Sequence, residues 1–178
     1  QFSVAVLAVR AGWRPEEIIA SDVSLFSTVL AASINQQSLS LFNIRMDGEP
    51  LAGEYAEVLY WQKYLSLLCQ SRHYSDTPLL ADLKGRKEAH IAAIKASLAG
   101  FSSLEGISYR RVDLFDELAE NVDSPEKVIW INPPGYKRGY DRLFATNSRL
   151  TWNNPSVKTF EPDKGHDKIR EMSLRGKA

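Results

Sequence analysis

Three short segments with strand character, each followed by a polar residue, constrain the fold of this chain more than any other feature. They are Ile18 to Ala20 before Asp22, Ile107 to Val112 before Asp113, and Lys127 to Ile131 before Asn132. Helical patterns separate them, and this alternation predicts an α/β fold with a parallel sheet. Ligands bind outside the carboxyl ends of parallel strands, so we expect the three polar residues to line one crevice.

Two apolar helices are predicted around the first strand. Residues 2–11 are apolar nearly all round, which favours a helix packed on the sheet, and Gly12 supplies a terminator. Residues 25–30 show helical spacing after the strand. Because the chain begins at Gln1 without a preceding strand or cap, we interpret it as an N-terminally truncated fragment.

A helical insertion is predicted at about residues 44–100. Leu51 to Gln70 has an aromatic-rich helical pattern, and a second helix is expected from Lys87 to Ala99, ended by Gly100. This stretch of roughly 50 residues far exceeds the dozen or so that a plain crossover needs. Four aromatic residues at helical spacing favour core packing over stacking on bases. They are Tyr55, Tyr60, Trp61 and Tyr64.

Composition allows one core, which we place in residues 1–150, and a tail at 151–178 that reads mostly as loop. Lys plus Arg and Asp plus Glu number 22 each, so the net charge attracts no particular partner. From Tyr136 onward there are 10 basic and 5 acidic residues, against 12 and 17 before it. This basic stretch is either a phosphate-binding flank or a solvated face.

Cysteine and histidine usage limits the class of protein. Cys69 is the single cysteine, so no disulfide forms within the chain, and its leucine neighbours predict a buried thiol in a reducing compartment. No apolar run is long enough to span a bilayer and no leader pattern opens the chain, so we expect a cytoplasmic protein. His73, His90 and His166 are scattered, which argues against a metal site.

The triplet Asn132, Pro133 and Pro134 directly follows the third predicted strand. Two prolines fix two successive φ angles and remove two backbone donors, so Asn132 is held in a rigid, extended step. Its side-chain carbonyl and the backbone carbonyl of Pro133 can accept hydrogen bonds from one substrate amine. Two such acceptors direct the nitrogen lone pair at an electrophile and stabilise the positive charge that develops there.

With this triplet, the chain resembles class I S-adenosylmethionine-dependent methyltransferases that carry an Asn/Asp-Pro-Pro-aromatic motif. The resemblance covers Phe2 to about Phe144, interrupted by the helical insertion, and extends more loosely to phage and plasmid adenine methyltransferases linked to antirestriction. It implies a Rossmann-like sheet with helices on both faces. It also implies methyl transfer from S-adenosylmethionine to an exocyclic amino group of a nucleic-acid base, with adenine in DNA as the expected acceptor.

The resemblance assigns roles to individual residues. Asp22 matches the acid that holds the ribose hydroxyls of the cofactor, and Asp113 matches the acid beside its adenine. Asn132 to Pro134 match the catalytic acceptors. The fourth motif position is Gly135 instead of an aromatic, so the adjacent Tyr136 is the candidate for stacking on the base. The glycine-rich cofactor loop of the family would lie before Gln1.

Several alternatives remain open from the sequence. Asp22 and Asp113 are equally well explained as N-caps of the helices that follow them. The acceptor could be an RNA guanine or a protein glutamine, because the triplet requires only a planar amine. Gly135 also permits a catalytically inactive relative that binds nucleic acid or a protein partner.

Overall fold

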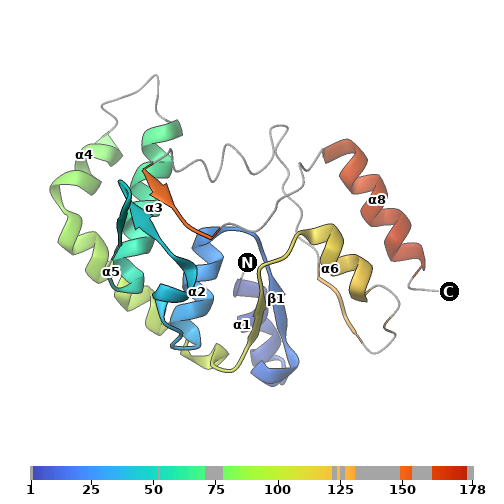
Figure 1. Cartoon of the computed structure of the whole chain (residues 1–178). Coiled ribbons are helices and arrows are strands. Elements are labelled where there is room, and N and C mark those ends of the chain that lie inside the picture. The colour runs from blue at the N-terminus through green and yellow to red at the C-terminus, as the bar shows by residue number, and fades with distance from the viewer. Residues whose placement is uncertain are drawn as a thin grey trace.

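The computed structural model describes residues 2–51, 53–70, 78–121, 124, 127–130, 149–153 and 162–175. Over these residues the chain has a mixed α/β structure that is mostly helical and contains two small sheets (Figure 1). This confirms the α/β class. The described residues do not form the broad Rossmann-like sheet that the sequence predicted.

Helix α2 (Leu25–Ile34) lies at the centre of the fold (Figure 1). Its sequence carries only apolar side chains and small hydroxyls, so it can be covered on all sides, and eight of its ten residues are buried. One apolar cluster joins it to α1 (Phe2–Arg10), and a second joins it to α3 (Tyr55–Gln70). The core therefore consists of two clusters separated by α2.

Helix α1 ends as predicted but is less buried than predicted. Gly12 follows it with a φ of 102°, a left-handed conformation that glycine adopts readily. Phe2 and Ala5 are buried, whereas Leu7 is largely exposed. The apolar sequence led us to expect cover on all faces, and a two-stranded sheet offers too little area to provide it.

A parallel pair formed by β1 (Ile19–Ser21) and β4 (Ser108–Arg110) confirms two of the three predicted strands. Ile19 lies opposite Ser108, and Ser21 lies opposite Arg110. The chain between these strands contains α2 to α5, so a long helical crossover joins them. The two strands consequently end at the same edge of the sheet.

The third predicted strand, at residues 127–131, is not a strand over its described part, residues 127–130. Val128 and Trp130 have 81% and 73% of their surface exposed. An apolar run becomes a strand only when a neighbour satisfies its backbone groups, and the ladders of the described residues join other segments. The sequence prediction was therefore wrong for this part of the chain.

A hairpin that we did not predict precedes α3. Strands β2 (Arg45–Met46) and β3 (Glu49–Pro50) are joined by Asp47 and Gly48, which both have positive φ. Asp-Gly is a preferred pair for such a two-residue turn. Strand β5 (Leu150–Thr151) pairs with the other edge of β2, so the order in this sheet is β3-β2-β5.

Helices α3, α4 (Pro78–Gly85) and α5 (Lys87–Ala99) lie in the stretch where we predicted a helical insertion. Tyr60 is buried, and its hydroxyl donates to the carbonyl of Leu83 over 2.9 Å. Its ring contacts those of Trp61 and Tyr64, so these aromatic residues contribute to packing, as expected. Cys69 is only partly buried, which corrects the prediction of a buried thiol.

Two further helices complete the described fold. Helix α6 (Leu114–Asn121) follows β4, as predicted, and α8 (Pro162–Arg175) lies in the tail that we expected to be mostly loop. Helix α8 begins at Pro162, and proline is well tolerated in the first turn of a helix. Gly165, in the tail predicted to be mostly loop, is buried within α8. Among the described residues, no helix is both long enough and apolar enough to cross a membrane.

Candidate functional site

The carboxyl ends of β1 and β4 place two of the predicted site residues at one edge of the sheet. The backbone N–H of Asp22 donates to the carbonyl of Arg110 over 3.2 Å, which extends the parallel ladder by one residue. Asp113 follows three residues after Arg110. Both aspartates are 7% exposed. The strands that precede these two residues therefore end at the same edge of the sheet.

The carboxylate of Asp22 accepts hydrogen bonds from its own chain on both oxygens. Oδ1 accepts from the backbone N–H groups of Val23 (2.7 Å) and Ser24 (3.2 Å). Oδ2 accepts from the hydroxyls of Ser24 (2.9 Å) and Ser27 (2.5 Å). A carboxylate offers about four lone-pair sites, and these four donors match that number.

Ser24 and Tyr109 extend this network to α2 and β4. The Ser24 hydroxyl accepts from the backbone N–H of Ser27, which makes Ser24 the N-cap of α2. The Tyr109 hydroxyl donates to the backbone carbonyl of Asp22 over 3.0 Å and lies 3.2 Å from the Thr28 hydroxyl. Burial raises the pKa of Tyr109 far above its ordinary value. The network thus joins β1, β4 and α2.

Asp113 has a local role at the start of α6. Its Oδ1 accepts from the backbone N–H of Phe115 over 2.9 Å, and its backbone carbonyl accepts from Glu117. This is the geometry of a helix N-cap. The capping alternative is thereby observed for Asp113, whereas Ser24, two residues after Asp22, is the N-cap of α2. The contact of either aspartate with a cofactor remains a prediction.

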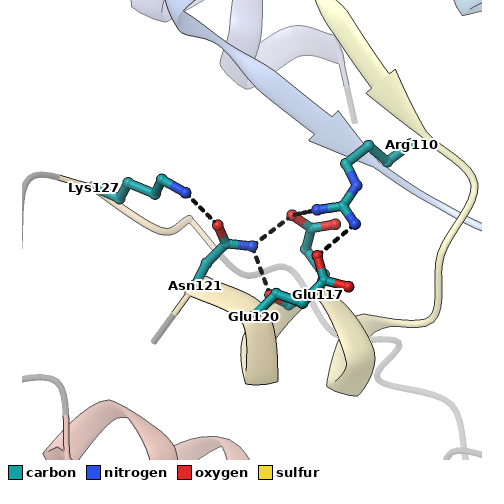
Figure 2. Close-up of polar contacts among 5 residues, drawn as sticks. All are labelled: Arg110, Glu117, Glu120, Asn121 and Lys127. Atoms are coloured by element: carbon teal, nitrogen blue, oxygen red, sulfur yellow. Dashed lines mark hydrogen bonds and ion pairs between the residues drawn. The ribbon is translucent and has the colours of Figure 1, made fainter. Parts of the chain in front are cut away.

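A polar network connects the end of β4 to α6 and to residue 127 (Figure 2). Arg110 contacts Glu117 over 3.2 Å and Glu120 over 2.5 Å. Asn121 donates to Glu117 Oε1 over 2.8 Å and accepts from Lys127 over 2.6 Å. The hydrogen bond that Arg110 donates to Glu120 and the charge of Glu117 raise the pKa of Arg110. The network therefore attaches the segment preceding Asn132 to α6.

The four predicted catalytic residues lie outside the described part of the chain. They are Asn132, Pro133, Pro134 and Tyr136. The described residues on both sides are anchored. Lys127 binds α6, and Arg149 forms a bidentate ion pair with Asp47 beside the β2-β5 pairing, with both distances at 2.7 Å.

Three contributors to the strand-end network were not identified from the sequence. Ser24 was detectable, because a serine just before an apolar helical run is a common N-cap signal. Ser27 and Tyr109 gave no comparable signal, because their roles depend on the approach of α2 and β4. Among the described residues, no group of three or more His, Cys, Asp or Glu side chains could hold a metal ion.

Comparison with known proteins identifies a family but no individual relative. No curated protein and no solved structure matches the chain. The family described as Phage DNA Adenine Methylase-like domain 1 matches residues 1–176, which is nearly the whole sequence. The match agrees with the resemblance carried by the strand-end acids and the Asn-Pro-Pro triplet. The chain therefore belongs to the Phage DNA Adenine Methylase-like domain 1 family.

Proposed function

We propose that this chain acts in methyl transfer from S-adenosylmethionine to the exocyclic amino group of adenine in DNA. The observation that carries the proposal is the parallel pairing of β1 and β4, which brings Asp22 and Asp113 to one edge of the sheet. Membership of a DNA adenine methylase-like family supports the same activity.

The chemistry of this edge suits a nucleoside better than a nucleotide. Helix N-termini beside parallel strands commonly bind phosphate, because their N–H groups and dipole attract anions. Here the N-termini of α2 and α6 already have the carboxylates of Asp22 and Asp113 beside them. Carboxylates repel phosphate but accept hydrogen bonds from hydroxyl and amino groups. Asp22 would hold the ribose and Asp113 the adenine of S-adenosylmethionine, which supplies a methyl group on a cationic sulfur.

Asn132 is proposed to orient the acceptor amine. Its side-chain carbonyl and the carbonyl of Pro133 would accept hydrogen bonds from the two amino N–H groups of the base. Tyr136 would stack on the base, because Gly135 stands where the family has an aromatic. These acceptors stabilise positive charge on nitrogen as the new bond forms. As the nitrogen takes the methyl group, the carbon–sulfur bond would break and S-adenosylhomocysteine would leave, and the nitrogen would release one proton to water.

The test is a methyl-transfer assay with labelled S-adenosylmethionine on adenine-containing DNA. We expect Asn132→Ala to lower the rate by about a hundredfold to a thousandfold, because one preorganised acceptor is lost. Affinity for the cofactor should remain near that of the parent. Asn153→Ala is the matched control, because this asparagine has an exposed side chain remote in sequence from the triplet. Equal rates for parent and Asn132→Ala would refute the assigned role.

A second candidate function is a binding module without catalysis. Gly135 in the aromatic position and the filled carboxylate of Asp22 favour it. A parent chain that binds DNA but transfers no methyl group to DNA, RNA guanine or protein glutamine would support this candidate. Methyl transfer to RNA or protein alone would instead revise the acceptor.

A further inference from the structure

The bonds around Asp22 raise a specific problem for the function proposed above. A ribose diol brings two hydroxyl donors, and the Asp22 carboxylate already accepts from two hydroxyls and two backbone N–H groups. Its roughly four acceptor positions are filled. A diol can therefore bind this carboxylate only by replacing donors of the chain itself.

We propose that the Ser27 hydroxyl occupies the position of a ribose hydroxyl on Asp22 and limits the affinity of this site for nucleosides. This inference rests on the proposed function. Ser27 is the donor at 2.5 Å on Oδ2, and its side chain is buried beside the carboxylate at the start of α2. Its hydroxyl must rotate away before a ligand hydroxyl can reach that oxygen.

The other three donors are less exchangeable than Ser27. The N–H groups of Val23 and Ser24 belong to the backbone that leads into α2, so moving them would disrupt the helix start. The Ser24 hydroxyl also accepts from the Ser27 N–H as the N-cap. Ser27 lies within the helix, where a serine hydroxyl can instead donate to the carbonyl four residues earlier. That carbonyl belongs to Val23.

This exchange predicts a gain of affinity when the Ser27 hydroxyl is removed. We expect Ser27→Ala to bind S-adenosylhomocysteine about tenfold more tightly than the parent, because the ligand no longer competes for one hydrogen bond to a charged group. Ser27→Cys should show a smaller gain, since a thiol of similar size is a weak donor. It also serves as a second variant should the alanine lower stability.

Titration calorimetry on the full chain provides the test, with circular dichroism verifying that each variant is folded. Ser33→Ala is the matched control, because it makes the same chemical change in the same helix and lies six residues from Ser27. The variants are titrated with S-adenosylhomocysteine and with its analogue lacking both ribose hydroxyls. The gain at Ser27 should appear with the first ligand and vanish with the second.

Three results would overturn the inference. Equal affinity of the parent, Ser27→Ala and Ser33→Ala would reject the role of Ser27 and leave the proposed function intact. A gain of affinity for Ser27→Ala that persists with the analogue lacking both ribose hydroxyls would show that the effect does not involve the ribose diol. Absence of binding by every folded variant would reject both this inference and the proposed function.

Discussion

Asp22 and Asp113 both stand between a strand and a helix in the sequence, but their side chains have different hydrogen-bond partners in the structure. Each follows a strand of the parallel pair, precedes a helix and is 7% exposed. The Asp22 carboxylate joins a network that reaches β1, α2 and β4, whereas the Oδ1 of Asp113 caps the adjacent α6. The sequence pattern therefore predicts that an acid lies at the edge of the sheet. It does not predict how many other elements the acid contacts.

The largest expected effect separates these two aspartates. Asp22→Ala removes the acceptor shared by the buried hydroxyls of Ser24 and Ser27 and by two backbone N–H groups, so we expect the free energy of unfolding to fall by about 3 kcal/mol. Asp113→Ala removes a helix cap and should cost about 1 kcal/mol. Urea denaturation of both variants measures the difference. Equal losses would show that the wider network adds no stability.

Tyr109 provides a smaller test of the same network. Tyr109→Phe removes the hydroxyl that donates to the Asp22 carbonyl, with an expected loss of about 1 kcal/mol near neutral pH. Burial raises the pKa of Tyr109 above its ordinary value of 10.0. The stabilisation from burying the neutral phenol is therefore fully present below pH 10 and is lost as the pH rises further.

The alkaline behaviour of the two proteins should accordingly differ. Between about pH 9 and about pH 11, the urea midpoint of the parent should fall more steeply than that of Tyr109→Phe. The other tyrosines, the lysines and Cys69 are common to both proteins, so the difference between the two pH profiles reports on Tyr109 alone. Parallel pH profiles would indicate that Tyr109 ionises as readily in the folded chain as in the unfolded chain.

The smallest expected effect lies outside the strand-end network, at the ion pair between Asp47 and Arg149. Both side chains are about half exposed, and the hydrogen bond from Arg149 lowers the pKa of Asp47. We expect Arg149→Met to lower stability slightly at low salt, with Arg45→Met as control because Arg45 binds an amide oxygen and a carbonyl.

Salt and acid should both reduce this effect. The contribution of Asp47 is present above its ordinary pKa of 3.8 and is lost as the pH falls below that value. High salt screens the exposed pair. A difference between Arg149→Met and the parent that persists in high salt would point to lost packing beside β5 rather than to lost charge.

Local patterns predicted much of the secondary structure. The apolar spacing around Val29 gave α2, Gly100 marked the end of α5, and Asp22 marked the end of β1. The strand β4 ends at Arg110, three residues before Asp113, which was expected to mark its end. The Asp47-Gly48 turn carried an equally clear local signal for the hairpin, which we overlooked. These features depend on neighbours within a few residues, which a sequence displays directly.

Predictions that needed distant partners were less successful. Residues 128–130 have the apolar composition of a strand, yet their described backbone joins no ladder. The sequence likewise did not decide whether Asp22 caps a helix or binds the ribose of a cofactor. In the structure Ser24 caps α2, while the Asp22 carboxylate accepts from the backbone N–H groups of Val23 and Ser24 and the Asp22 backbone carbonyl accepts from Tyr109 on β4.

The sequence by itself determined the succession of α1, β1 and α2, the parallel relation of β1 and β4, and the family to which the chain belongs. Only the tertiary structure decided that the carboxylate of Asp22 accepts from two serine hydroxyls and that its backbone carbonyl accepts from Tyr109. The physical reason is that periodicity and turn chemistry act over a few neighbouring residues. The occupancy of a buried acceptor depends on groups that meet only when the strands and α2 pack together.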